Sequence, residues 1–407
     1  MTIADALILT VPRSTGFEGW VRVGRLAREA HLLRELAPGY GRIVLVSRGG
    51  EPNGNELAAL RDAVGPEQSG SFELIALGGP DGSDGTPAGL ESALASRLGG
   101  ARTAVVQTIE LDDAALALGI GGALGRLGVE SALVARGGCV PSRIMAWRHG
   151  PHSAAAVGAG EEERRLCAQA SVVVGATEAM LDDLTWRFEI DPDTTRLVRT
   201  FVPDGPEPAG TSPRDPDLLF SWGPLEVSSR HDAVVEAAGR LPEQMRSSVR
   251  LEIAGEGPER ARLARLAEER DVRLSLPGEV GYDAFVERCL RCAVYVHAAL
   301  YNPEPIGVLD AMSLGAPVIA AESPGAGGLI ENGVSGIRVP GSVDSLGYAL
   351  EGVLPDADWR EMLGACAAQR VRSRSVVGKV AADLMSAHVD ALSNAGIGAQ
   401  ELRRRSA

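Results

Sequence analysis

Apolar runs of strand length alternate with segments of helical spacing along most of the chain. The runs in the first half are ALILTV, RIVLVS, SFELIAL, TAVVQT, ESALVA and SVVVGA. The segments between them are rich in Ala, Leu and Arg, with apolar residues at the spacing of an amphipathic helix. Continuous apolar strands joined by helices are typical of a parallel sheet covered on both faces.

A stretch rich in proline and aspartate, PDGPEPAGTSPRDPD, interrupts this pattern, and we interpret residues 204–217 as a linker. The alternation resumes with LLFSWG, VRLEIAG, DVRLSLPG, AVYVHA, PVIAAE and GIRV. The sequence therefore predicts an α/β protein of two doubly wound domains, 1–203 and 218–373, which a length of 407 residues accommodates. Their ligand sites should lie at the carboxyl ends of the strands and face a cleft.

The composition excludes several classes of function. A net charge of −14 and a pI near 5.0 argue against a nucleic-acid surface. No apolar run approaches the roughly 20 residues of a membrane span, and the first residues lack the features of a secretory signal. We therefore expect a cytoplasmic protein.

Metal, redox and hydrolytic chemistry find little support in the sequence. Cys289 and Cys292 form a lone CxxC without a second pair at zinc spacing. The sequence DPD occurs twice, but in linker-like surroundings. No serine-hydrolase, zincin or P-loop motif is present. We expect no metal and no cofactor.

Five blocks in the second half, in their order and spacing, resemble the carboxyl-terminal domain of GT-B glycosyltransferases of family 4. They are LEIAGEGPE, LPGEV, YVHA, DAMSLGAPVIA and ENGVSGIRV. The first half is similar to one branch of this family through STGFEGWVRVGRLAREAHL, ARGGCVPS and EEERRLCAQASVVVGATEAM. The resemblance implies two Rossmann-like domains, with the acceptor on the first and the nucleotide sugar on the second. It also implies a last helix, within about 374–407, that completes the first domain.

The resemblance implies two carboxylates around the segment YNPEPIGVLDAMSLGAPVIA, one contacting the transferred sugar and the other the nucleotide ribose. Read without a gap, Asp310 takes the ribose role and Asn302 the sugar position. Alternatively, EPIG matches the family's order, and Glu304 is the sugar contact. In both cases the amides around Ile306 and Gly307 meet the distal phosphate. Asp310 could instead be a solvated acid that stabilises the helix dipole.

A cation should neutralise the leaving diphosphate. Arg230 lies where the resemblance implies a lysine, and we assign it this catalytic role. Pro224 stands where the family has a second cation, an arginine. Arg230 could instead be a solvent-exposed arginine at a helix start, and we interpret His231 beside it as a surface residue. Glu226 either contacts the sugar or faces water.

Glycines complete the implied donor site. Gly255 and Gly257 in AGEGPE mark a strand-end turn where backbone can reach the nucleotide. Val280 lies in the segment that reads the base in the family. Gly325 can bring an amide near a phosphate or sugar, whereas Gly328 stands where the family has an acid.

The first domain offers two candidates. Gly16 follows the first strand together with Ser14 and Thr15, where the resemblance implies a loop that cradles the donor phosphate or the acceptor. Arg136 ends a later strand, where many relatives have a histidine near the reacting carbon. Arg136 could bind an acceptor carboxylate or form a salt bridge at the domain interface.

Three arginines in the first domain, Arg22, Arg25 and Arg28, recur at helical spacing and could form a solvated basic face. Such a face could support a membrane-surface role, which the net acidity and the scarcity of aromatic residues oppose.

The sequence thus predicts a retaining glycosyltransferase that moves a sugar from a GDP or UDP sugar to a small-molecule acceptor. The acceptor could belong to bacterial specialised metabolism, as an aminocyclitol or a thiol, or to surface polysaccharide synthesis. The departures at Pro224, Asn302 and Gly328 keep two alternatives open, a non-catalytic binding or activating subunit and an enzyme with an unusual donor. We expect a monomer or homodimer.

Overall fold

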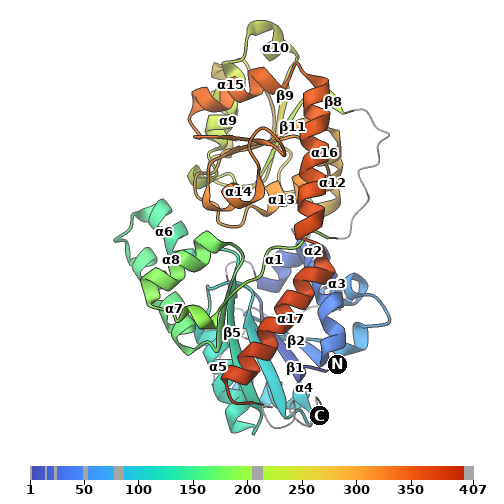
Figure 1. Ribbon diagram of the computed structural model, residues 1–407, viewed down its shortest axis with the longest axis vertical. Coiled ribbons are helices and arrows are strands. Elements are labelled where there is room, and N and C mark those ends of the chain that lie inside the picture. Colours follow the sequence, from blue (N-terminus) through green and yellow to red (C-terminus); the bar gives the residue numbers. More distant parts are fainter. Residues whose placement is uncertain are drawn as a thin grey trace. The chain divides into compact units, whose positions relative to one another are not determined.

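The computed structural model describes residues 2–13, 16–22, 25–48, 54–77, 87–203 and 214–397. The chain divides into two compact units, which are described separately. Unit 1 comprises Met1–Pro203 with Val377–Ala407, and unit 2 comprises Asp204–Val376. Each unit is a parallel sheet with helices packed on its faces, so the expected α/β class with two doubly wound sheets is confirmed (Figure 1).

Unit 1 has a seven-stranded parallel sheet in the order β3-β2-β1-β4-β5-β6-β7. Its strands are β1 Ala4–Thr10, β2 Tyr40–Arg48, β3 Phe72–Leu77, β4 Thr103–Thr108, β5 Glu130–Gly137, β6 Val172–Gly175 and β7 Thr195–Leu197. Its helices are α1 Gly16–Arg22, α2 Arg25–Leu36, α3 Gly54–Val64, α4 Pro87–Leu98, α5 Ala114–Arg126, α6 Pro141–His149, α7 Ala154–Gln169, α8 Glu178–Phe188 and α17 Val377–Asn394, with short 3₁₀ turns at Ala37–Gly39, Ser69–Ser71 and Pro192–Thr194. The chain order reverses between β1 and β4, which is where doubly wound sheets bind ligands.

Unit 2 has a six-stranded parallel sheet in the order β10-β9-β8-β11-β12-β13. Its strands are β8 Asp215–Trp222, β9 Arg250–Ala254, β10 Arg273–Ser275, β11 Cys292–His297, β12 Val318–Ala321 and β13 Ile337–Val339. Its helices are α9 His231–Gly239, α10 Glu243–Ser248, α11 Arg260–Glu269, α12 Tyr282–Arg291, α13 Ile306–Ser313, α14 Pro324–Leu329, α15 Val343–Val353 and α16 Ala357–Arg374, with a 3₁₀ turn η4 at Val227–Ser229. Here the order reverses between β8 and β11.

Burial on both faces explains the continuous apolar strands. In β1, Leu7 and Leu9 pack into a core that includes Leu384 of α17. The alternate residues of β1, including Ile8, pack into a second core with Leu116 of α5. Because successive side chains of a strand point to opposite faces, a strand between two helical layers must be apolar at every position.

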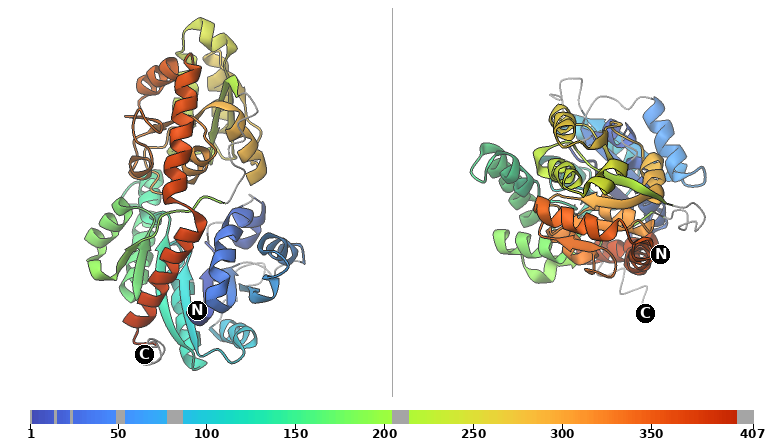
Figure 2. Two further views of the ribbon diagram at one scale, coloured as in Figure 1. Left: turned by 45° about the vertical axis from the view of Figure 1, so that its right-hand side comes forward. Right: turned by 90° about the horizontal axis from the view of Figure 1, so that it is seen from above.

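The carboxyl-terminal helix α17 belongs to unit 1, where it contacts α2, β5 and β6 (Figures 1 and 2). Its His388 is fully buried, with Nε2 2.6 Å from Oε1 of Gln107 on β4 and Nδ1 against the hydroxyl of Tyr40. The guanidinium of Arg196 also donates to Asp390 of this helix at 2.8 Å. Polar bonds as well as apolar packing therefore attach the last helix to the first unit.

The structure departs from the expected elements in two places. Strand β8 begins at Asp215, so the second DPD opens a strand and does not belong to a linker; residues 204–213 of the predicted linker lie outside the described residues. The edge strand β7 was not expected, because its sequence TRL has no apolar run and all three residues are only half-buried. Strands at sheet edges bury less surface and so leave a weaker pattern.

Candidate functional site

The loops that follow β8 and β9 in unit 2 interlock at the carboxyl edge of the sheet. The amide of Leu225 donates to the carbonyl of Glu256 at 2.9 Å. A Cβ on Gly255 would lie 2.0 Å from the carbonyl oxygen of Gly223, and one on Gly257 would lie 2.4 Å from that of Leu225. Both glycines also have positive φ, +149° and +155°. Close backbone approach therefore requires these two glycines, and their donor-binding role remains a prediction.

Arg230 lies between η4 and α9, in the left-handed region with φ of +53°. Its side chain is half-buried, and Nη1 donates to the carbonyl of Gly341, after β13, at 2.6 Å. No other hydrogen bond of Arg230 occurs within the described part of the chain. A guanidinium has five N–H donors, so Arg230 is held in place while keeping donors for an anion. The alternative that Arg230 is a solvent-exposed arginine at a helix start is therefore wrong.

The interpretation of His231 as a surface residue is wrong. Its side chain is only 4% exposed, and Nδ1 lies 3.2 Å from Oγ of Ser221 on β8. Burial lowers the pKa of His231 to about 4, against weaker opposing effects of the Gly223 backbone and of Asp232. The imidazole is therefore neutral at physiological pH.

The loop before α13 is tied to the start of α14. The carbonyl of Asn302 accepts from the amide of Gly325 at 3.1 Å. A Cβ on Gly325 would lie 2.2 Å from Cδ of Pro305, so only glycine fits there. Because its amide already has a partner, Gly325 does not offer that group to a phosphate in this conformation.

Helix α13 begins at Ile306 without a side-chain cap. Among the described residues, the amides of Gly307 and Val308 have no backbone partner, which leaves the donors that an anion would use at a helix start. A Cβ on Gly307 would lie 2.5 Å from the hydroxyl of Tyr295 and 2.9 Å from Cε3 of Trp222. Gly307 thus also serves the packing of α13 against the sheet.

Asp310 lies one turn beyond Gly307 on α13 and is only 2% exposed. Burial raises the pKa of Cys289 and Tyr295, and the negative charges of a neighbouring cysteine and of Asp310 add to this effect. The alternative of a solvated dipole-stabilising acid is therefore wrong. The ribose-binding role of Asp310 remains a prediction, and its carboxylate is buried in this conformation.

Three other predicted donor contacts are half-buried residues of loops at this edge. Glu304 lies in the loop before α13, Glu226 directly precedes η4, and Val280 lies between β10 and α12. The amide of Gly255 donates to the carbonyl of Gly278, which joins the Val280 loop to the β9 loop. The sheet thus brings the predicted donor-binding loops of unit 2 to one edge.

Sequence reasoning missed His297, the last residue of β11. Its Nε2 lies 3.4 Å from Nδ2 of Asn302. Burial, and next the positive charge that His231 can carry, lower the pKa of His297 to about 4. A polar residue at the end of the apolar run AVYVHA was the available signal, since strand ends at this edge carry functional side chains.

At the carboxyl edge of unit 1, Gly16 begins α1 with φ of +61°, and its neighbours Ser14 and Thr15 lie outside the described residues. Arg136 is half-buried near the end of β5, with its backbone bonded to the hydroxyl of Thr108, and its charge contributes to lowering the pKa of His388. Arg136 and Gly16 belong to a different unit from the other candidates.

Glu110 is a second residue that sequence reasoning missed. It follows β4 and accepts from the amides of Gly138 and Cys139, at 3.1 and 3.3 Å, and from Nη2 of Arg25 at 3.2 Å. It therefore orients the loop after β5.

Arg28 is only 4% exposed and donates to the carbonyl of Phe201 at 2.6 Å. Arg25 and Arg28 are thus not a solvated basic face, and the side chain of Arg22 lies outside the described residues.

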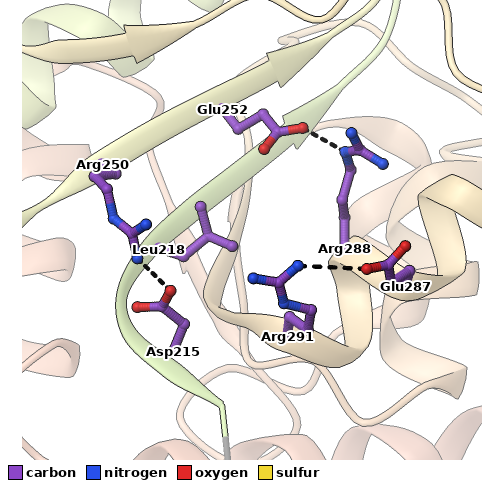
Figure 3. A pocket seen from close by; sticks show the side chains of 7 residues that line it. All are labelled: Asp215, Leu218, Arg250, Glu252, Glu287, Arg288 and Arg291. Carbon is purple, nitrogen blue, oxygen red and sulfur yellow. Dashed lines mark hydrogen bonds and ion pairs between the residues drawn. The ribbon is translucent and has the colours of Figure 1, made fainter.

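A pocket of about 160 Å³ in unit 2 lies away from these loops (Figure 3). Its lining includes the first residues of β8 and β9, so it lies toward the amino ends of these strands. Its three arginines are paired with three acids: Arg250 with Asp215, Arg288 with Glu252 and Arg291 with Glu287. The paired charges leave no excess of positive charge for a diphosphate.

The CxxC cysteines, Cys289 and Cys292, are buried and free. Burial raises the pKa of Cys292 to about 12 and that of Cys289 well above its usual value. Within the described residues, no group of three His, Cys, Asp or Glu side chains is arranged to hold a metal ion. No helix in the described ranges is both long and apolar enough to cross a membrane.

Residues 207–370 match the family model described as Glycosyl transferases group 1. Two curated relatives are an alpha-D-kanosaminyltransferase of Streptomyces kanamyceticus and a D-inositol 3-phosphate glycosyltransferase of Frankia alni. The first is 24% identical over 51% of this chain and 57% of its own length. The second is 28% identical over 52% of this chain and 58% of its own length. The chain thus spans a little over half of the relatives it matches.

Solved structures of glycosyltransferases share the fold across both units. Anabaena Alr3699/HepE, solved with UDP and glucose, matches with a TM-score of 0.68 at 15% identity, over 94% of this chain and 98% of that one. Sucrose-phosphate synthase of Thermosynechococcus elongatus matches with a TM-score of 0.70 at 18% identity, over 93% and 97%. At these identities the likeness establishes the GT-B fold.

Proposed function

The chain is a GT-B protein whose residues 207–370 match the glycosyl transferases group 1 family, and we propose that it transfers a glycosyl group from a GDP or UDP sugar to a small-molecule acceptor with retention. The observation that carries the proposal is the convergence of Arg230, the loop before α13 and the uncapped start of α13 at one edge of unit 2. The donor binds at this edge, and the acceptor binds to unit 1.

The diphosphate is held by cationic and amide donors. Arg230 contributes the guanidinium donors that Gly341 does not use, and Gly307 and Val308 contribute amides at the positive end of the α13 dipole. These groups stabilise negative charge as it develops on the leaving phosphate. They also replace part of the charge neutralisation that a metal would supply, so the proposal includes no metal and no cofactor.

Retention follows from attack on the face that the leaving group departs from. The bond between the anomeric carbon and the phosphate oxygen breaks, and the acceptor oxygen, nitrogen or sulfur bonds to that carbon. The acceptor's proton passes to the departing phosphate oxygen, so no enzyme nucleophile takes part. Positioning and electrostatic stabilisation supply most of the acceleration.

One curated relative is a D-inositol 3-phosphate glycosyltransferase by name, which supports a cyclitol acceptor; the name of the other, a kanosaminyltransferase, gives only the transferred group. We propose an acceptor of this kind in bacterial specialised metabolism, and a cytoplasmic reaction. Arg136 is the proposed acceptor contact on unit 1.

Calorimetric titration with UDP, GDP, ADP and dTDP tests the donor site. We expect micromolar binding of one nucleotide, weakened by about 1–3 kcal/mol in Arg230→Ala through the loss of a charged hydrogen bond. Asp310→Ala tests the ribose role, with the same expected loss. Arg196→Ala, which removes a half-exposed arginine of unit 1, is the matched control and should leave nucleotide binding unchanged. A folded protein that binds none of the four nucleotides would refute the transferase and favour a non-catalytic subunit.

A further inference from the structure

The side chain and backbone of Asn302 are held from two elements. Its carbonyl accepts from the amide of Gly325 at 3.1 Å and lies 3.5 Å from Oγ of Ser323, both at the start of α14. Its side-chain Nδ2 faces Nε2 of His297, at the end of β11, at 3.4 Å. Asn302 is therefore positioned by the sheet and by α14, although it lies in a loop.

The Asn302 loop reaches the same point as the proposed phosphate clamp. Arg230 donates to the carbonyl of Gly341, and a Cβ on Gly341 would lie 2.5 Å from Cδ2 of Leu300. Leu300 is two residues before Asn302, so the backbone at Gly341 is shared by the clamp and this loop. A sugar attached to a phosphate bound at Arg230 would lie within reach of this neighbourhood.

The imidazole of His297 fixes the direction of the Asn302 amide. Asn302 Nδ2 can only donate, so this contact is a hydrogen bond when the neutral His297 ring carries its proton on Nδ1 and Nε2 accepts. Such an acceptor exists only while the ring is neutral, and the pKa of about 4 keeps it neutral at physiological pH. With Nδ2 on the ring, the carbonyl oxygen Oδ1 is turned away from His297, and no partner for it occurs in the described part of the chain.

We propose that His297 is a positioning residue that holds the Asn302 amide so that Oδ1 accepts a hydrogen bond from a hydroxyl of the donor sugar. This inference rests on the proposed function. It assigns recognition of the sugar to an uncharged pair of side chains. An uncharged acceptor suits a site in which Pro224 provides no cation, because a carboxylate in its place would repel the diphosphate with less positive charge to offset it.

The test compares binding of UDP with UDP-glucose, and of GDP with GDP-mannose, in five variants. Asn302→Ala removes the acceptor, and His297→Phe keeps a ring of similar size without its nitrogen. His297→Gln restores an acceptor for the amide, and the double variant Asn302→Ala/His297→Phe measures coupling. His152→Phe, at an exposed histidine of unit 1, is the control.

We expect Asn302→Ala and His297→Phe each to weaken binding of the sugar nucleotide about tenfold, as for one hydrogen bond. Binding of the free nucleoside diphosphate should change less than about twofold, because the nucleotide does not contact the pair. The double variant should be no weaker than Asn302→Ala, and His297→Gln should regain most of the affinity. A purely structural role of His297 would instead weaken both ligands and would not be rescued by glutamine.

Imidazole nitrogen NMR provides a second readout that needs no ligand. The His297 ring should show the Nδ1–H tautomer, and its Nε2 resonance should move in Asn302→Ala but not in His152→Phe. Independent, additive losses in the double variant, or an Nε2–H tautomer, would overturn the inference. Equal affinity of the wild type for nucleotide and sugar nucleotide would also overturn it while leaving nucleotide binding intact. Failure to bind any nucleotide would overturn the proposed function together with it.

Discussion

His388 allows a quantitative prediction about how the last helix is held to unit 1. The ring is fully buried, with Nδ1 against the hydroxyl of Tyr40 and Nε2 2.6 Å from Oε1 of Gln107. Burial, and next the positive charge of Arg136, lower the pKa of His388 to about 3. The informative change is His388→Gln, because a glutamine can accept from the tyrosine and donate to Gln107 but does not titrate.

The sign follows from proton uptake by the two states. The unfolded chain protonates His388 as the pH falls through about 6.5, whereas the folded protein does so only near pH 3. The stability that the neutral His388 ring contributes is therefore fully present above pH 6.5 and is lost as the pH falls from about 6.5 to about 3. For one proton, the free energy of unfolding changes by about 1.4 kcal/mol per pH unit, and the total loss between the two pKa values is about 3–5 kcal/mol.

Hydrogen exchange measured by mass spectrometry separates the units, for which a single unfolding free energy is not defined. We expect the free energy of opening at β4 and α17 to fall between pH 6.5 and 4.5 by about 1.4 kcal/mol per unit more steeply in the wild type than in His388→Gln. His152→Gln, at an exposed histidine, should follow the wild type. Parallel pH profiles for the wild type and His388→Gln would refute the conclusion that His388 is buried and neutral in the folded protein.

Three further predictions concern unit 2 and the thiols. Arg214→Ala should destabilise unit 2 by about 2–4 kcal/mol, measured by hydrogen exchange at α13. The reason is that the guanidinium donates to carbonyls at the ends of α12 and α13, at 2.6 Å to Cys289 and 2.7 Å to Gly315. Unchanged exchange at α13 would contradict this, and Arg214→Lys should lose less stability. Gly307→Ala should cost about 1–3 kcal/mol by overpacking, and a stability equal to the wild type in urea unfolding followed by exchange at α13 would contradict it. Iodoacetamide should label the half-exposed Cys139 before Cys289, which is buried with a raised pKa, and equal labelling rates in the native protein would contradict the burial.

The sequence by itself determined the two sheets and their division. Strands buried on both faces must be largely apolar, and all twelve predicted runs, including the more polar run at the edge strand β10, are strands of the structure. The edge strand β7 was missed because its three half-buried residues, TRL, contain no apolar run. The resemblance to the glycosyltransferase family also followed from short blocks, since loops at the carboxyl edge carry residues that only ligands or close backbone packing demand.

Only the tertiary structure decided what individual polar residues do. The sequence cannot distinguish a solvated arginine from Arg214, which lies in the predicted linker yet caps two helices. It likewise could not reveal that His231 is buried, which depends on how α9 packs, or that His297 faces Asn302, which depends on the path of the loop after β11. Burial and hydrogen bonding are set by residues distant in the sequence, and these set the charge and direction of each polar group.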